Sequence, residues 1–188
     1  ADAACLARAL RAGQLPALRA LRLDRNALGA GAGAAAVVEA WVSRDRRRAG
    51  GAGPRRLQLG YNPGMGAPAL GRVLDALAAP AARGLRYLGL GHAGWDERGA
   101  RHPLMDRLTA RTLPNVAAAL EELVLECNEI GLPAMRALAA CAAALALPRL
   151  HTLDLSDNIP TRAQTRALTA QLARSVPALE SVCLCCGM

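Results

Sequence analysis

A nine-residue segment occurs six times along the chain and limits the folds that this sequence can adopt. The copies align without gaps and start at residues 18, 54, 85, 120, 150 and 179. They read LRALRLDRN, PRRLQLGYN, LRYLGLGHA, LEELVLECN, LHTLDLSDN and LESVCLCCG. A repeat of this length indicates a fold in which each unit buries its apolar side chains against the units before and after it.

Apolar residues, mostly leucine, occupy positions 1, 4 and 6 of this segment. Side chains of a strand alternate between its faces, so positions 4 and 6 share one face and positions 3, 5 and 7 share the other. The stretches between the copies space apolar residues three and four apart, which indicates amphipathic helices. The expected strands cover 20–24, 56–60, 87–91, 122–126, 152–156 and 181–185. The expected helices cover 33–47, 67–79, 104–119, 132–146 and 161–176.

The pattern L-x-x-L-x-L-x-x-N resembles the leucine-rich repeats of the ribonuclease-inhibitor-like class, and the resemblance covers practically the whole chain. It implies an α/β solenoid, a horseshoe with a parallel sheet on its concave face and helices on its convex face. It also implies that the Asn at position 9 bonds backbone groups of the turn. The matching residues are Asn26, Asn62, Asn128 and Asn158, whereas the third and sixth copies have Ala93 and Gly187.

The chain is expected to form one leucine-rich repeat domain over residues 1–188, with about five full repeats. Residues 1–12 resemble the helix half of a preceding unit, and the last copy is a strand segment without a following helix. Neither end has a polar cap, which solenoids usually need for solubility. We therefore expect a segment of a longer protein, or a subunit whose ends are covered by a partner.

Composition limits the compartment and the class of site. Hydrophobic residues form 53% of the chain, but no apolar run reaches the roughly 18 residues of a membrane span, and no export signal is visible. Six cysteines without disulfide-like pairing favour a reducing, intracellular compartment, cytoplasmic or organellar. Cys183, Cys185 and Cys186 are clustered, but the neighbouring repeat offers only Asp154 and Ser156, so neither a metal nor a cofactor is expected.

Charge is divided between the two halves of the chain. Residues 1–100 carry 15 Arg against 7 acidic residues, a net charge of +8, and residues 101–188 carry 8 Arg against 8, a net charge of 0. In the first three copies, the basic residues at positions 2, 3 and 5 are Arg19, Arg22, Arg55, Arg56 and Arg86. In the fourth and fifth copies, acidic residues at positions 3, 5 and 7 are Glu122, Glu126 and Asp154.

Two interpretations of this charge pattern remain open. Arg19, Arg55 and Arg86 are expected on neighbouring strands about 4.8 Å apart, where they repel one another unless water or an anionic partner screens them. One interpretation is a solvated surface with chance clustering. The other is a bipolar concave surface, basic at its amino-terminal end and acidic at its carboxy-terminal end, that orients a partner of opposite polarity.

Two insertions lengthen the repeats. Residues 43–56 are Gly-rich and contain six Arg, and they are expected to form a flexible basic loop. Residues 92–103 bring Trp95 into a polar loop, where an exposed Trp often anchors an interface. The alternative is that Trp95 folds back over the end of a helix. Trp41 lies on an apolar helix face and is expected in the core.

Position 8 places His92, Cys127 and Asp157 on three consecutive units. A catalytic relay needs the His between the thiol and the carboxylate, but here the Cys lies between the other two. A neighbouring carboxylate also raises the pKa of a thiol and makes it a poorer nucleophile. The order argues against catalysis, and no phosphate loop or zinc-type spacing is found. We therefore expect no catalytic residue and no small-molecule substrate.

The favoured function is non-catalytic protein–protein interaction, through the concave sheet and the two long loops. The charged residues at positions 2, 3, 5 and 7 and Trp95 are the expected contacts. Three alternatives remain: a structural subunit of a large assembly, a GTPase-activating protein of the Ran activator type, which shares this repeat class, and a nucleic-acid-associated protein acting through the basic first half.

Overall fold

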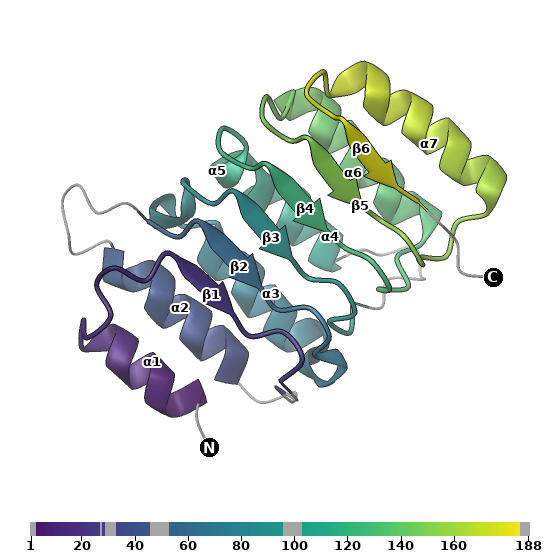
Figure 1. The fold of residues 1–188 in the computed structure, drawn as a ribbon. Helices are drawn as coiled ribbons and strands as arrows, with labels where there is room; N and C mark the ends of the chain where they lie inside the picture. Colours follow the sequence, from purple (N-terminus) through teal and green to yellow (C-terminus); the bar gives the residue numbers. More distant parts are fainter. Residues whose placement is uncertain (1–2, 27, 29–32, 46–52, 96–102, 185–188) are drawn as a thin grey trace.

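The computed structural model describes residues 3–26, 28, 33–45, 53–95 and 103–184, which form an α/β architecture. Its strands are β1 (Ala20–Arg22), β2 (Arg56–Gln58), β3 (Tyr87–Gly89), β4 (Glu122–Val124), β5 (Thr152–Asp154) and β6 (Ser181–Cys183). They form one sheet in which each strand is parallel to the next and the order follows the chain (Figure 1). Every strand lies within its expected range.

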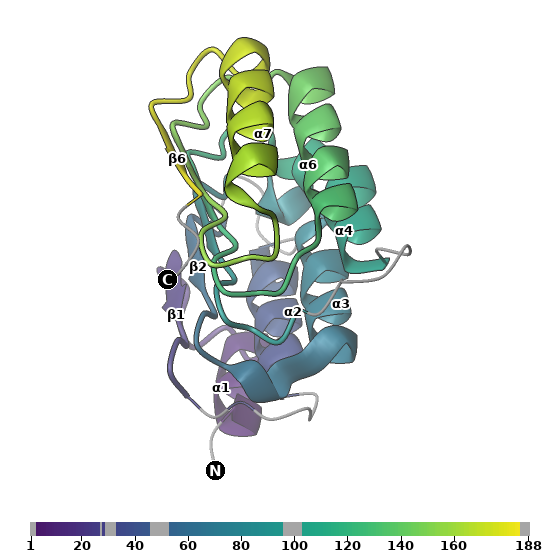
Figure 2. The same ribbon diagram turned by 90° about the vertical axis from the view of Figure 1, so that its right-hand side faces the viewer.

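Helices cover one face of this sheet. They are α1 (Ala3–Arg11), α2 (Gly33–Asp45), η1 (Pro63–Met65), α3 (Gly66–Leu77), η2 (Pro80–Ala82), α4 (Pro103–Arg107), η3 (Leu108–Thr112), α5 (Leu113–Val116), α6 (Leu132–Leu145) and α7 (Arg162–Ser175). Figure 2 views the two layers edge-on, with the strands along one side and the helices along the other. Among the described residues, no helix lies on the opposite face of the sheet.

The register of the sheet matches the alignment of the repeats residue for residue. One row of paired residues crosses all the strands: Leu21, Leu57, Leu88, Leu123, Leu153 and Val182. The leucines of this row are at most 4% exposed, and Val182 is half-buried. Burying one such side chain contributes about 1.5–3 kcal/mol, so the row is a main attachment of the sheet to the helices.

The regular strands end at position 5, two residues before the expected ranges do, and the chain turns at position 8. The position-8 residues, here called the turn edge, are Arg25, Tyr61, His92, Cys127 and Asp157, and their φ angles lie between 48° and 58°. This left-handed conformation is costly for residues other than glycine. The hydrogen-bond ladder continues to the turn edge, where the Tyr61 amide donates to the Gly91 carbonyl at 2.8 Å.

Asparagines at position 9 of the second, fourth and fifth units tie their turns to the preceding ones. Asn128 is 1% exposed. Its Oδ1 accepts hydrogen bonds from the amides of Ala93 at 3.0 Å and Trp95 at 3.4 Å. Its Nδ2 donates to the carbonyls of Leu90 at 2.8 Å and Leu125 at 3.2 Å. Buried backbone groups of two successive units are thereby paired by one side chain, and Asn62 and Asn158 make the equivalent bonds.

The turn of the second unit is closed differently, because position 9 of the third unit is Ala93. Without an asparagine from the next unit, the chain forms the 3₁₀ helix η1, and the Met65 amide donates to the Asn62 carbonyl at 3.0 Å. Pro63 begins this turn, where its fixed φ and missing N–H are tolerated. Gly187, the other departure from the pattern, lies outside the described residues.

The helical region 103–116 differs from the single helix expected over 104–119. It runs through α4, the π-helix η3 and α5. Pro114 has no N–H for the Ala110 carbonyl, and its ring would crowd that carbonyl in an α-helix. A wider π turn accommodates it. Trp41 of α2 is buried as expected, and its Nε1 donates to the Leu18 carbonyl at 3.0 Å.

A charged sheet face as the candidate binding site

Positions 2, 3, 5 and 7 of the strands form the face of the sheet that is free of helices, here called the sheet face. In β1, Ala20 and Arg22 are exposed and Leu21 between them is buried. Strands β2, β4 and β5 repeat this alternation with half-buried outer residues. The pattern confirms that positions 3 and 5 of these four strands point away from the helices.

The basic half of the sheet face lies on β1, β2 and the start of β3. Its predicted residues are Arg19, Arg22, Arg55, Arg56 and Arg86. The guanidinium carbon of Arg56 lies 3.5 Å from the centre of the Tyr87 ring. Nη1 of Arg55 donates to the Gly84 carbonyl at 3.4 Å. The structure therefore brings the five arginines to one region and holds two of them by contacts within it.

The expected ladder of Arg19, Arg55 and Arg86 is present in register. The amide of Arg55 donates to the Arg19 carbonyl, and that of Arg86 to the Arg55 carbonyl, each at 2.8 Å. The next residue in the row is Glu121, whose Oε1 lies 3.2 Å from Nη1 of Arg86. The ladder thus ends in an ion pair at the boundary between β3 and β4, which offsets part of the expected repulsion.

The acidic half of the sheet face lies on the fourth and fifth units. The predicted residues Glu122, Glu126 and Asp154 are all half-buried there. Oδ1 of Asp154 accepts hydrogen bonds from the Ser156 amide at 2.9 Å and the Ser156 hydroxyl at 2.6 Å. All eight charged residues chosen from the sequence therefore lie on one face, and the two signs are separated along the chain.

Two glycines after Tyr87 make room for side chains from neighbouring units. A Cβ on Gly89 would lie 1.9 Å from Oε1 of Gln58, and a Cβ on Gly91 would lie 2.5 Å from Cγ of Glu126. Gln58 and Glu126 thus extend over the third unit from opposite sides. Oε1 of Gln58 is buried and accepts no hydrogen bond from the part of the chain described. The basic and acidic halves meet in this packed centre.

The two tyrosines of the chain border this centre, and they were not among the residues predicted for the binding site. Burial raises the pKa of Tyr87, and the Glu126 carboxylate is the main cause that raises the pKa of Tyr61. The Tyr61 ring lies 5.6 Å from the His92 ring and 5.0 Å from the guanidinium carbon of Arg25. The composition could have pointed to these two residues, because this chain has only two Tyr and no Phe, and both Tyr occur in the repeated segment.

Two interpretations were open for Trp95, an exposed interface anchor and a side chain that folds back over the end of a helix, and the expected exposure is wrong. Its side chain is 1% exposed, and its amide donates to Oδ1 of Asn128 at 3.4 Å. The polar residues around Trp95 in the sequence suggested exposure, but burying its large apolar surface outweighs the short polar context. Trp95 supports the turn of the third unit, and its side chain offers almost no surface to a partner.

The turn edge brings Cys127 and Asp157 together, as their spacing in the repeat predicted. Sγ of Cys127 lies 3.8 Å from Oδ2 of Asp157. Burial, and then the Asp157 carboxylate, raise the pKa of the Cys127 thiol. The thiol is therefore protonated at neutral pH and a poor nucleophile. A cavity of about 490 Å³ opens beside it, with His92 and Trp95 among its lining residues.

No family model, curated protein or solved structure matches this chain. The functional assignment therefore depends on the surfaces described above. In the described ranges, no helix has the length and apolar character needed to cross a bilayer. Within the same ranges, no three His, Cys, Asp or Glu side chains are grouped so that they could hold a metal ion. Cys185, Cys186 and most of both insertions, 46–52 and 96–102, lie outside these ranges.

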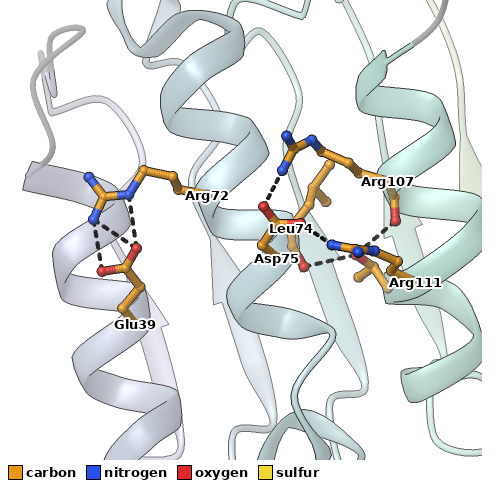
Figure 3. A network of polar contacts seen from close by, with 7 residues as sticks. Glu39, Arg72, Leu74, Asp75, Arg107 and Arg111 are labelled. Carbon is orange, nitrogen blue, oxygen red and sulfur yellow. Dashed lines mark hydrogen bonds and ion pairs between the residues drawn. The ribbon is translucent and has the colours of Figure 1, made fainter.

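Several arginines of the helix layer form ion pairs with carboxylates of neighbouring helices (Figure 3). Arg72 of α3 binds Glu39 of α2 through two hydrogen bonds of 2.9 and 2.8 Å. Arg107 and Arg111 both pair with Asp75 of α3. Each exposed pair contributes at most about 1 kcal/mol. These arginines link adjacent helices to one another.

Proposed function

We propose that this chain is a leucine-rich repeat protein of the ribonuclease-inhibitor-like class, and that the sheet face is the concave surface of its solenoid. The alignment of six segments and their residue-for-residue register support this proposal. The asparagine bonds between successive turns support it as well, because the resemblance implies them. Each unit buries its leucines against its neighbours, as a stack of repeats requires.

The proposed function is non-catalytic binding of a protein partner on the sheet face. The observation that carries it is the separation of charge on that face, where arginines outnumber the Asp24 carboxylate before the Arg86–Glu121 pair and carboxylates follow it. Such a surface attracts a partner of opposite polarity and fixes its orientation, because the reversed orientation would bring like charges together. Helices leave this face open in the described part of the chain, so a partner can reach it.

Reversing the charge of the basic half tests this proposal. The variant carries Arg55→Glu, Arg56→Glu and Arg86→Glu, and the control carries Arg136→Glu, Arg166→Glu and Arg174→Glu on the exposed surface of α6 and α7. We expect the sheet variant to weaken binding about 100-fold, since charge pairs at protein interfaces contribute about 1 kcal/mol or more each. Its affinity should also depend less on salt.

The measurement is calorimetric titration of the partner purified from the source organism, at several salt concentrations, with thermal melting of each variant to confirm folding. The net charge of the two variants is the same, so a general electrostatic effect would weaken both equally. Equal weakening, or no change in the sheet variant, would count against binding on the sheet face.

A further inference from the structure

Two arginines of the sheet face and the turn edge lie against the only two tyrosines of the chain. Arg56 lies over the Tyr87 ring at 3.5 Å, and Arg25 lies over the Tyr61 ring at 5.0 Å. A guanidinium over a ring gains about 0.5–2 kcal/mol and loses rotational freedom. Arg56 also covers Tyr87, which is 9% exposed. Both guanidiniums are therefore held in defined places before any partner binds.

The edges of these two guanidiniums have hydrogen-bonding capacity to spare. Among the described residues, neither the Arg25 nor the Arg56 guanidinium has an ion-pair or hydrogen-bond partner. Arg72 of the helix layer, in contrast, is paired through its Nε and Nη2 to Glu39. A guanidinium presents five N–H donors in a rigid plane, and stacking occupies only the faces of that plane. Its edge can still bind a carboxylate through two parallel hydrogen bonds.

The tyrosines also separate these arginines from the acidic half. Glu126 lies close enough to both phenols to raise their pKa values. In strand order, Arg25 precedes Tyr61 and Arg56 precedes Tyr87, whereas Glu126 belongs to the later, fourth unit. In strand order, each tyrosine thus comes between its arginine and the unit that carries Glu126, which is consistent with an unpaired guanidinium.

The size of the basic half limits the length of an anionic ligand. The distance from β1 to β4 is three strand spacings, or about 14 Å. An extended segment of three residues spans about 10 Å and fits before the acidic half begins. A longer run of phosphates would meet Glu122 and Glu126. Nucleic-acid bases would also find the tyrosine faces covered by arginine, so they could not stack there.

We propose that Arg25 and Arg56, positioned by Tyr61 and Tyr87, form a carboxylate-binding site for a short acidic segment of a protein partner. The inference rests on the proposed function, since it names the chemistry of the partner on the same face. Arg25 lies five residues beyond Ala20, the residue that pairs with Arg56. A segment therefore needs at least two Asp or Glu side chains to reach both guanidiniums.

Fluorescence anisotropy with a labelled peptide, Gly-Ser-Glu-Glu-Glu-Ser-Gly, tests the site at roughly physiological salt. The matched peptide Gly-Ser-Gln-Gln-Gln-Ser-Gly should bind at least tenfold more weakly. Arg25→Ala and Arg56→Ala should each weaken binding of the acidic peptide about tenfold, the effect of losing about 1.5 kcal/mol of charge-assisted hydrogen bonding. Arg136→Ala on exposed α6 removes the same charge and should leave binding unchanged. Thermal melting confirms that each variant is folded.

Arg56→Lys separates a stacked guanidinium from a simple positive charge. Lysine keeps the charge but cannot make the planar two-bond contact, so the Lys variant should bind as weakly as the Ala variant. Wild-type affinity in Arg56→Lys would overturn the proposal. Tighter binding of a twenty-nucleotide oligothymidine than of the acidic peptide, lost in the same variants, would overturn the assignment to a carboxylate.

Failure of the carboxylate site can be distinguished from failure of the proposed function. If the acidic peptide is insensitive to Arg25 and Arg56 while the triple charge reversal still weakens the natural partner, the carboxylate site is wrong and the binding face stands. If the peptide binds as predicted but the natural partner ignores the triple reversal, the proposed function is wrong.

Discussion

Replacing Asn128 by alanine is expected to lower the free energy of unfolding by about 4 kcal/mol, which corresponds to a fall in Tm of roughly 12 °C. The side chain makes four hydrogen bonds to backbone groups of the third and fourth units. Alanine leaves the Ala93 amide and the carbonyls of Leu90 and Leu125 without this partner. Each buried unpaired group costs about 1–3 kcal/mol, and these groups are enclosed by the turns around them.

Chemical denaturation followed by circular dichroism measures this effect, and Asn26→Ala is the matched control. Asn26 occupies the same position of the first unit, but it is exposed and, among the described residues, its side chain makes one hydrogen bond, from Nδ2 to the Asp24 carbonyl at 2.9 Å. Its replacement should cost no more than about 0.5 kcal/mol. Equal effects of the two substitutions would mean that the asparagine bonds do not hold the turns together.

Trp95→Ala is expected to lower the free energy of unfolding by about 3–5 kcal/mol, the usual cost of deleting a buried aromatic side chain. Trp95 is 1% exposed. Trp95→Phe should cost less than half as much, because Phe keeps most of the buried ring. The substitution by Phe also removes the indole Nε1, which is buried and has no hydrogen-bond partner among the described residues. Calorimetric melting of both variants checks the order.

A different result would restore the role that the sequence suggested for Trp95. If Trp95→Ala melts like the wild type and only partner affinity falls, the side chain acts as an interface anchor. The burial of Trp95 instead predicts that the folded Trp95→Phe variant keeps its partner affinity within about twofold of wild type, since buried residues away from the interface contribute little to binding.

Much of the fold followed from the repeat because position in a repeat determines position in space. Aligning Leu57 with Leu88 in the sequence was enough to predict that they are neighbours in the sheet, and they are paired. The same reasoning placed Arg55 beside Arg86 and Cys127 beside Asp157. The α/β architecture and the sides of the charged residues were therefore predictable from periodicity alone.

Contacts that depend on side-chain shape were not predictable from position. The alignment put Arg56 and Tyr87 in one row, but whether a guanidinium stacks on a ring or turns to water depends on its rotamer. The room over Gly89 and Gly91 is also taken by Gln58 and Glu126 from neighbouring units. This packing of side chains from one unit over the glycines of another cannot be predicted from a single segment of the sequence.

Local exceptions to the repeat were the other source of error. The strand ranges ran to position 7, whereas the regular strands end at position 5. The positive φ of the position-8 residues was not predictable either, because the residue types at that position differ from unit to unit. The break in the helix after α4 could have been predicted from Pro114, since proline cannot continue an α-helix without a distortion. Arg86 and Glu121 are adjacent in the row of position-2 residues, so their ion pair could also have been predicted from the sequence.

Site-specific photo-crosslinking shows whether a protein partner lies on the sheet face. A photoreactive amino acid is placed at Ala20 or Ser181, exposed residues of that face, and at Ala140 or Ala170 on the exposed surface of α6 and α7. We predict that the two sheet positions crosslink to one partner in an extract of the source organism, and that the triple arginine reversal abolishes those crosslinks. Crosslinks of equal yield from the helix positions, or from those positions alone, would contradict binding on the sheet face.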